Sequence, residues 1–189
     1  MIQVYTGNGK GKTTAAIGLA IRALGAGHRV FMMQFMKSLA YSEQHILRKM
    51  PNMTLETSGK PFFIAEEGML DEKTKNLLGE DVVIFPKGKP PEDYISLLTS
   101  SFDRVMDVLV KGKVGLVILD EINIALFFGL LQREQMENLL EILPHETELV
   151  CTGRNAPEWL LDRADLITEM REVRHYYEQG VPARKGIEN

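Results

Sequence analysis

The glycine-rich run Gly7-Asn8-Gly9-Lys10-Gly11-Lys12-Thr13-Thr14 is the segment that most constrains the fold of this chain. It follows an alternating, β-type segment at residues 2–5 and precedes a stretch whose apolar residues recur at helical spacing. Glycines in such a loop let the backbone wrap around a phosphate chain and direct N–H groups at its oxygens. The order strand, glycine loop, helix therefore predicts a phosphate-binding loop that opens an α/β unit.

Two side chains of this run have the chemistry that a nucleotide needs. Lys12 brings a positive charge to the phosphates, and Thr13 offers a hydroxyl to Mg²⁺. The strict pattern has a glycine where this chain has Thr6, so the loop is a variant with denser glycines. The alternative is a flexible turn with exposed lysines, which the strand-then-helix context disfavours. We expect the ATP-binding residues to be Gly7, Asn8, Gly9, Lys10, Gly11, Lys12, Thr13 and Thr14.

The rest of the chain alternates between strand-type and helix-type segments. The segment at residues 29–35 is almost wholly apolar, as in a strand that is covered on both faces. Dividing 189 residues by about 150 per domain gives one domain. We expect helices near 42–50, 92–111, 132–143 and 158–163, and strands near 53–57, 116–121, 148–151 and 164–170. The predicted fold is a single α/β domain of the P-loop NTPase type (RecA-like), with a mainly parallel sheet sandwiched by helices.

Residues 58–93 are the least regular part of the sequence, because glycines and prolines recur throughout them. A long irregular segment inside a compact domain is often a functional lid or substrate loop, and the alternative is a small structural insertion. The short apolar run Val82-Val83-Ile84-Phe85 could add an edge strand there. Residues 171–189 are expected to form an extended, polar and exposed tail.

A second functional element is the apolar run Leu116-Val117-Ile118-Leu119, which ends in Asp120 and Glu121. A buried parallel strand would carry these acids to the carboxyl edge of the sheet, beside the phosphate-binding loop. There they can hold Mg²⁺ directly or through water. We expect Thr13, Asp120 and Glu121 to form the metal site, with Asp120 nearer the metal and Glu121 either on the metal or activating a water.

Other candidates are weaker. Arg154, after a short strand, could bring a guanidinium to a phosphate or could belong to an ordinary turn. Phe62 and Phe63 could stack on a planar ligand or anchor the irregular segment. Cys151 lies in an apolar strand and is expected to be a small buried side chain. The four histidines share no metal-ligand spacing.

Composition limits the class of protein. The formal net charge of −4 disfavours a nucleic-acid binder, because phosphate contacts need clustered Lys and Arg. No apolar run reaches the length of a membrane helix, so no membrane partner is expected. A single cysteine excludes an internal disulfide framework and fits a reducing compartment. We expect a cytoplasmic protein.

Taken together, several motifs resemble the P-loop class of ATP:corrinoid adenosyltransferases, the CobA/BtuR type. The string from Gly7 to Ala16 resembles the family's loop most closely. Agreement extends to Gln34-Phe35-Met36-Lys37, Leu119-Asp120-Glu121, Thr152-Gly153-Arg154, the segment from Ala164 to Met170 and the tail from Arg174 to Glu188. It fails over residues 58–93, where the family places an aromatic residue against the corrinoid. Only Phe62 matches that aromatic.

The resemblance implies transfer of the 5′-deoxyadenosyl group of ATP to cob(I)alamin or a related corrinoid, with release of triphosphate. It implies Lys12, Thr13 and Glu121 as catalytic residues, Arg154 as an ATP contact and Phe62 as a corrinoid contact. The implied cofactor is Mg²⁺ or Mn²⁺. A flavoprotein reductant and a homodimer are the implied partners. The loss of Phe62 is expected to weaken corrinoid use far more than ATP binding.

Two other classes of function remain open from the residues alone. One is a P-loop kinase or ATPase of different specificity, which would react at the γ-phosphate. The other is a non-catalytic ATP-binding sensor that kept the nucleotide site and lost the corrinoid pocket. The products formed from ATP and reduced corrinoid distinguish the three.

Overall fold

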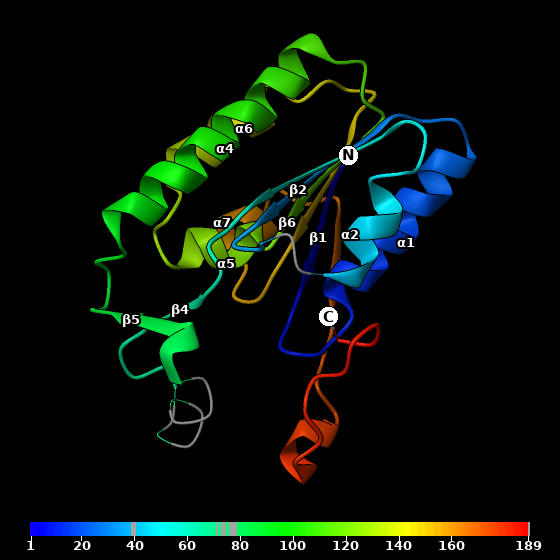
Figure 1. The fold of residues 1–189 in the computed structure, drawn as a ribbon. Helices are drawn as coiled ribbons and strands as arrows, with labels where there is room; N and C mark the ends of the chain where they lie inside the picture. Colours follow the sequence, from blue (N-terminus) through cyan, green and yellow to red (C-terminus); the bar gives the residue numbers. More distant parts are fainter. Residues whose placement is uncertain (39–40, 71, 73–74, 76–78, 189) are drawn as a thin grey trace.

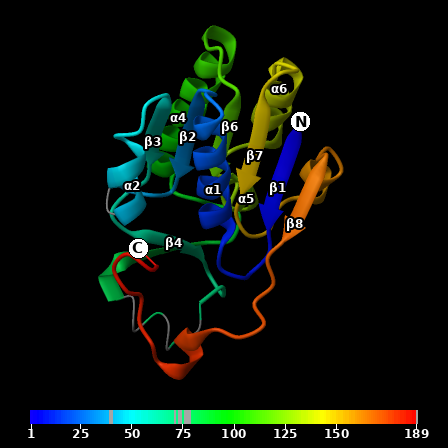
Figure 2. The same cartoon turned by 90° about the vertical axis from the view of Figure 1, so that its right-hand side faces the viewer.

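The computed structural model describes residues 1–38, 41–70, 72, 75 and 79–188. Its centre is a six-stranded sheet in the order β3-β2-β6-β7-β1-β8, and every pairing in it is parallel. Figure 2 shows this sheet from its face, with β3 and β8 at the two edges. The strands are β1 (Ile2–Thr6), β2 (Val30–Phe35), β3 (Met53–Ser58), β6 (Leu116–Asp120), β7 (Glu148–Thr152) and β8 (Leu166–Glu169). The predicted α/β fold with a mainly parallel sheet is confirmed.

Helices cover both faces of the sheet (Figure 1). One face carries α1 (Lys12–Gly25) and α2 (Ser42–Leu47). The opposite face carries α4 (Glu92–Lys111), α5 (Ile122–Phe127), α6 (Arg133–Ile142) and α7 (Glu158–Leu161). Within the described parts of the chain, no helix is long and apolar enough to cross a membrane.

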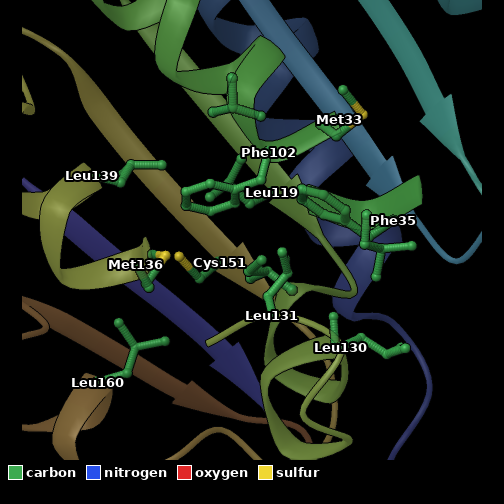
Figure 3. Packing of buried hydrophobic residues seen from close by; sticks show 14 of the residues in the cluster. Met33, Phe35, Phe102, Leu119, Leu130, Leu131, Met136, Leu139, Cys151 and Leu160 are labelled. Atoms are coloured by element: carbon green, nitrogen blue, oxygen red, sulfur yellow. The ribbon is translucent and has the colours of Figure 1, made fainter. Parts of the chain in front are cut away.

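The core is divided into two clusters by the alternation of side chains along the strands. In β2, Phe31, Met33 and Phe35 belong to the larger cluster, whereas Val30 and Met32 belong to the smaller one. This follows from the period of two, which sends neighbouring side chains to opposite faces. Figure 3 shows part of the larger cluster, in which Phe102 of α4 and Met136 of α6 belong to the same core as the strand residues Met33, Leu119 and Cys151. Both faces of β2 are therefore buried, as its almost wholly apolar sequence predicted.

Helix α4 illustrates how closely local sequence signals define an element. Pro91 precedes its first turn, Glu92 and Asp93 lie in that turn, and Lys111 lies in the last one. Acidic residues near the start and a basic residue near the end stabilise the helix dipole. Its buried face repeats at helical spacing, through Tyr94, Leu98, Phe102, Val105 and Leu109. The predicted helix at 92–111 is confirmed at both ends.

The irregular segment contains two short strands, β4 (Phe63–Glu66) and β5 (Val82–Phe85). They pair in parallel with each other and form a separate two-stranded sheet. The prediction that Val82–Phe85 adds an edge strand is thus correct for the strand and wrong if it is placed in the main sheet. Figures 1 and 2 show the pair near the carboxyl ends of the main strands. The part of the expected lid at residues 71, 73–74 and 76–78 lies outside the described residues.

Several elements were not predicted, and β4 is one of them. Helix α5 begins immediately after Glu121, where the sequence analysis placed no helix. The chain after β8 also forms a short 3₁₀ helix at Tyr176–Gln179. Further along the tail, the side chain of Glu188 is only 14% exposed. The tail is mostly exposed, as predicted, but it folds back toward the phosphate-binding loop.

Candidate active site

The phosphate-binding loop joins β1 to α1 and turns sharply at Gly11, which has φ 119° at the N-terminus of α1. A positive φ of this size favours glycine, so Gly11 permits the turn into the helix. The Lys12 ammonium folds back into the loop and donates to the carbonyl oxygens of Gly7 at 2.7 Å and Gly9 at 2.8 Å. Burial lowers the pKa of this lysine. The loop therefore holds a buried cation at its centre.

Gly7 and Gly9 have a role that the sequence analysis did not assign. A Cβ atom on Gly7 would lie 2.4 Å from the carbonyl oxygen of Met170, and one on Gly9 would lie 2.8 Å from the backbone of Arg171. The Gly9 N–H already donates to the Met170 carbonyl at 2.7 Å. These two glycines thus let the end of β8 pack directly against the loop, and the Gly9 N–H is engaged by protein rather than directed at a phosphate.

Asp120 joins the loop to the acid-bearing strand. Its side chain is fully buried at the end of β6. Oδ1 accepts from Thr13 Oγ1 at 2.9 Å and from Thr152 Oγ1 at 2.6 Å. Oδ2 accepts from Gln34 Nε2 at 3.1 Å and from Lys37 Nζ at 2.7 Å. The predicted meeting of Thr13 and Asp120 is therefore confirmed, and four donors occupy the carboxylate.

Glu121 follows in a left-handed conformation, with φ 62°, at the point where β6 turns into α5. Its N–H donates to Thr152 Oγ1 at 3.1 Å, which fixes the turn. Burial and then the neighbouring Asp120 carboxylate raise the pKa of Glu121 above its usual range. Lys12, Lys37 and Arg154 oppose that shift. The cations Lys12, Lys37 and Arg154 therefore lie close to the carboxyl groups of Asp120 and Glu121.

Arg154 lies beyond β7 after Gly153, whose φ of 131° is accompanied by a tight approach to Asn123. A Cβ on Gly153 would lie 3.1 Å from the Asn123 Cβ. The buried Asn123 amide donates to the Gly153 carbonyl at 3.1 Å. This contact holds the turn that presents Arg154, and no pattern in the sequence indicated it.

Two cavities border this region, and Arg154 lines both of them. The first, which we call the loop cavity, has a volume of about 730 Å³ and is lined by most of the phosphate-binding loop with Lys37, Glu121 and Arg154. The second, the apolar cavity, has a volume of about 800 Å³. Its walls include Met36, Ile64, Met69, Leu70, Ile124 and Phe128. Asn8, Ile124 and Arg154 line both cavities, so the two spaces share a wall.

Phe62 lines neither cavity, although the sequence analysis expected it at the corrinoid. Its ring packs edge-on against Tyr94 at 6.2 Å between centroids, beside the larger core cluster. Of the two readings for the Phe62–Phe63 pair, this contact favours anchoring for Phe62. The residues of the irregular segment that do reach the apolar cavity come a few positions later, at Ile64, Ala65, Met69 and Leu70.

The tail closes part of the loop cavity. Lys10 Nζ donates to Glu188 Oε1 at 3.1 Å and to the Ile187 carbonyl at 3.0 Å, and it lies 3.3 Å from the Tyr176 hydroxyl. Hydrogen bonds from Arg184 and Tyr176 lower the pKa of Glu188, so its carboxylate is firmly ionised. Lys10 is thereby bound to the tail, a long-range pairing that sequence spacing could not reveal.

The whole chain, residues 1–189, matches the family model described as ATP:corrinoid adenosyltransferase BtuR/CobO/CobP. A corrinoid adenosyltransferase of Pseudomonas aeruginosa is 31% identical over 100% of this chain and 83% of its own length. The corrinoid adenosyltransferase of Escherichia coli is 30% identical over 100% of this chain and 85% of its own. The corrinoid adenosyltransferase CobA of Salmonella typhimurium is 31% identical over 100% of this chain and 85% of its own length. The fold agrees with this match, because a phosphate-binding loop and the strand that ends in Asp120 meet at the edge of a parallel sheet. This chain belongs to the ATP:corrinoid adenosyltransferase family.

Proposed function

We propose that this chain, a corrinoid adenosyltransferase by family, binds ATP in the loop cavity and the corrinoid in the apolar cavity. The observation that carries the proposal is the wall shared by the two cavities, formed by Asn8, Ile124 and Arg154. A transfer between two substrates needs their reacting atoms held close together. The cations on the wall of the loop cavity suit a polyphosphate, and the apolar side chains on the wall of the second cavity suit a large planar macrocycle.

The reaction that follows is a displacement at C5′ of ATP. The electron pair of the reduced cobalt, Co(I), forms the bond to C5′, while the bond from C5′ to the triphosphate oxygen breaks and its pair leaves with the triphosphate. The cobalt nucleophile has no proton to lose, so the site needs no general base. Its work is to orient the reactants and to stabilise the negative charge of the leaving group.

The charged residues of the loop cavity can do this work. Lys12 and Arg154 are cations on its wall, and Thr13 and Glu121 complete the same wall. We assign Lys12, Thr13 and Glu121 as catalytic residues and Arg154 as a contact to ATP. The Gly9 N–H, which is bonded to Met170, is not among the donors available to phosphate.

The donor set fits a magnesium ion that also binds ATP. Thr13, Asp120 and Glu121 offer the hard oxygen ligands that Mg²⁺ prefers, and Mg²⁺ usually takes only one or two carboxylates together with phosphates and water. Within the described residues, no group of three or more His, Cys, Asp and Glu forms a metal cage. Because four donors occupy Asp120, Glu121 is the carboxylate free to bind the ion directly. Mg²⁺ or Mn²⁺, when bound, neutralises phosphate charge.

The decisive assay incubates the protein with ATP and chemically reduced cobalamin in the absence of oxygen. We expect triphosphate and a product with a cobalt–carbon bond, which is seen from its absorption spectrum and its sensitivity to light. Formation of ADP would instead indicate a kinase or ATPase. Nucleotide binding without any turnover would indicate a sensor, and either result contradicts the proposal.

The placement of the corrinoid is tested by a pair of variants in the irregular segment. Met69 is 45% exposed and lines the apolar cavity, so Met69→Glu puts a charge on that wall without burying it in the core. We expect this change to raise KM for the corrinoid about tenfold or more and to leave the affinity for ATP unchanged, because an apolar contact is replaced by a charge. Phe62→Ala is the comparison, and it should have the smaller effect on corrinoid KM. A larger effect of Phe62→Ala would place the corrinoid against Phe62 instead.

The proposals for the remaining partners are based on the similarity to the family. We propose a flavoprotein as the source of electrons for Co(I), and a homodimer as the assembled form. The single cysteine, which is fully buried, supports a reducing, cytoplasmic location.

A further inference from the structure

Lys37 is a cation that reaches the loop cavity from a different element than the phosphate-binding loop. It follows β2 by two residues, and its side chain is 13% exposed. Its ammonium lies 2.7 Å from Asp120 Oδ2 and 3.2 Å from Thr13 Oγ1. The same nitrogen lies 5.4 Å from the centroid of the Tyr41 ring. Lys37 therefore borders the place where Thr13 meets the phosphates of a bound nucleotide.

The backbone around Lys37 is built to direct this side chain. Met36 has φ 59°, a left-handed conformation that costs a bulky residue about 1–2 kcal/mol. The Met36 N–H donates to the Ser58 carbonyl at 2.5 Å, which holds the turn against the end of β3. A Cβ on Gly59 would lie 2.4 Å from the backbone nitrogen of Lys37, so only glycine allows this close packing. Strain and close packing at one turn indicate that the position of Lys37 matters.

The Lys37 ammonium lies among acidic groups at the wall of the loop cavity. It is 2.7 Å from Asp120 Oδ2, and Glu121 lines the same cavity. A buried carboxylate such as Asp120 needs a nearby cation, and Lys37 is its ion-pair partner. Yet Asp120 also accepts from Thr13, Thr152 and Gln34, and Lys37 still borders the cavity. An ion pair alone would not require exposure to that cavity.

We propose that Lys37 is a further triphosphate-binding residue, in addition to Lys12 and Arg154, and that it contacts the phosphates beside Thr13 while it keeps its ion pair with Asp120. A lysine has three N–H donors, and the contacts with Thr13 and Asp120 leave one for a phosphate oxygen. Lys12 reaches the same cavity from within the loop, so two cations from separate elements face the leaving triphosphate. This inference rests on the proposal that ATP occupies the loop cavity.

The test measures binding of inorganic triphosphate by calorimetry, in buffer with a chelator so that no divalent metal takes part. Lys37→Met keeps most of the side-chain length and removes the charge. We expect it to weaken triphosphate binding about tenfold or more, as for the loss of one charge-assisted hydrogen bond. Lys111→Met is the matched control, because it removes the same charge at the exposed end of α4 and should leave binding unchanged.

A second pair of variants separates phosphate binding from support of Asp120. Lys37→Met leaves a buried carboxylate without its cation, so its thermal stability is expected to fall. Lys37→Met with Asp120→Asn removes both charges and should recover the stability but not the triphosphate affinity. Recovery of wild-type affinity in that double variant would make Lys37 purely structural and overturn the inference.

Different results would contradict the role of Lys37 and the placement of ATP in the loop cavity. If wild-type protein binds triphosphate and Lys37→Met binds it equally well, only the role of Lys37 is wrong. If the wild-type protein binds no triphosphate while it does carry out adenosyl transfer, the placement of ATP in the loop cavity is wrong, and the role of Lys37 with it.

Discussion

Replacement of Lys12 with alanine should lower adenosyl transfer at least about 100-fold while the fold persists. A charge-assisted hydrogen bond contributes roughly 1.5–3 kcal/mol, and a lysine among phosphates makes more than one. Lys12 is buried in the loop, with its ammonium 2.7 and 2.8 Å from two loop carbonyls. Its removal deletes the cation nearest the loop backbone without opening either core cluster.

The measurement is steady-state transfer with ATP and reduced cobalamin, accompanied by far-ultraviolet circular dichroism. Arg22→Ala is the control, since Arg22 is exposed in the last turn of the same helix and should change neither quantity. Turnover near that of the wild type, with a normal spectrum, would refute the assignment of Lys12 to the phosphates.

Replacement of Gly7 with alanine should both destabilise the protein and abolish ATP binding. Gly7 has φ 93°, and a Cβ there would lie 2.4 Å from the Met170 carbonyl oxygen. Strained backbone and overpacking each cost about 1–3 kcal/mol, so a loss of roughly 2–6 kcal/mol in the free energy of unfolding is expected. The clash can be relieved only if the loop moves away from β8, which distorts the phosphate site.

Gly18→Ala is the matched control for this change. Gly18 lies in the middle of α1, and a Cβ there would have nothing within 4 Å. Alanine is preferred to glycine in a helix, so this variant should gain about 0.5–1 kcal/mol. Denaturant unfolding and nucleotide titration of both variants check the prediction. If Gly7→Ala is as stable as the wild type and binds ATP normally, the tight contact with Met170 does not shape the loop.

The fold and the centre of the site could be predicted because their signals are local. The alternation of apolar segments revealed the parallel sheet, and the helix predicted at 92–111 has the same limits in the structure. The meeting of Thr13 with Asp120 followed from a rule of topology: carboxyl ends of parallel strands share one edge. Each of these predictions needs only residues near one another or a single general rule.

What escaped prediction depends on contacts between distant segments. The pairing of β5 with β4, rather than with the main sheet, is decided by three-dimensional packing. The attachment of Lys10 to Glu188 and of Asn123 to Gly153 joins segments that sequence spacing does not relate. One signal was available for Lys37, because Gln34 is a polar residue inside an apolar strand and marks the end that faces the site.

The position of β1 in the sheet decides when the active site can form during synthesis. This first strand lies between β7 and β8, and both of its partners belong to the last part of the chain. During synthesis β1 stays unpaired until β7 and β8 have been made, and such long-range pairing is slow. The glycine loop next to it acquires its shape only when Met170 arrives to pack against Gly7 and Gly9. Incomplete chains therefore lack a formed phosphate site, and the ability to hold ATP arises together with the finished sheet.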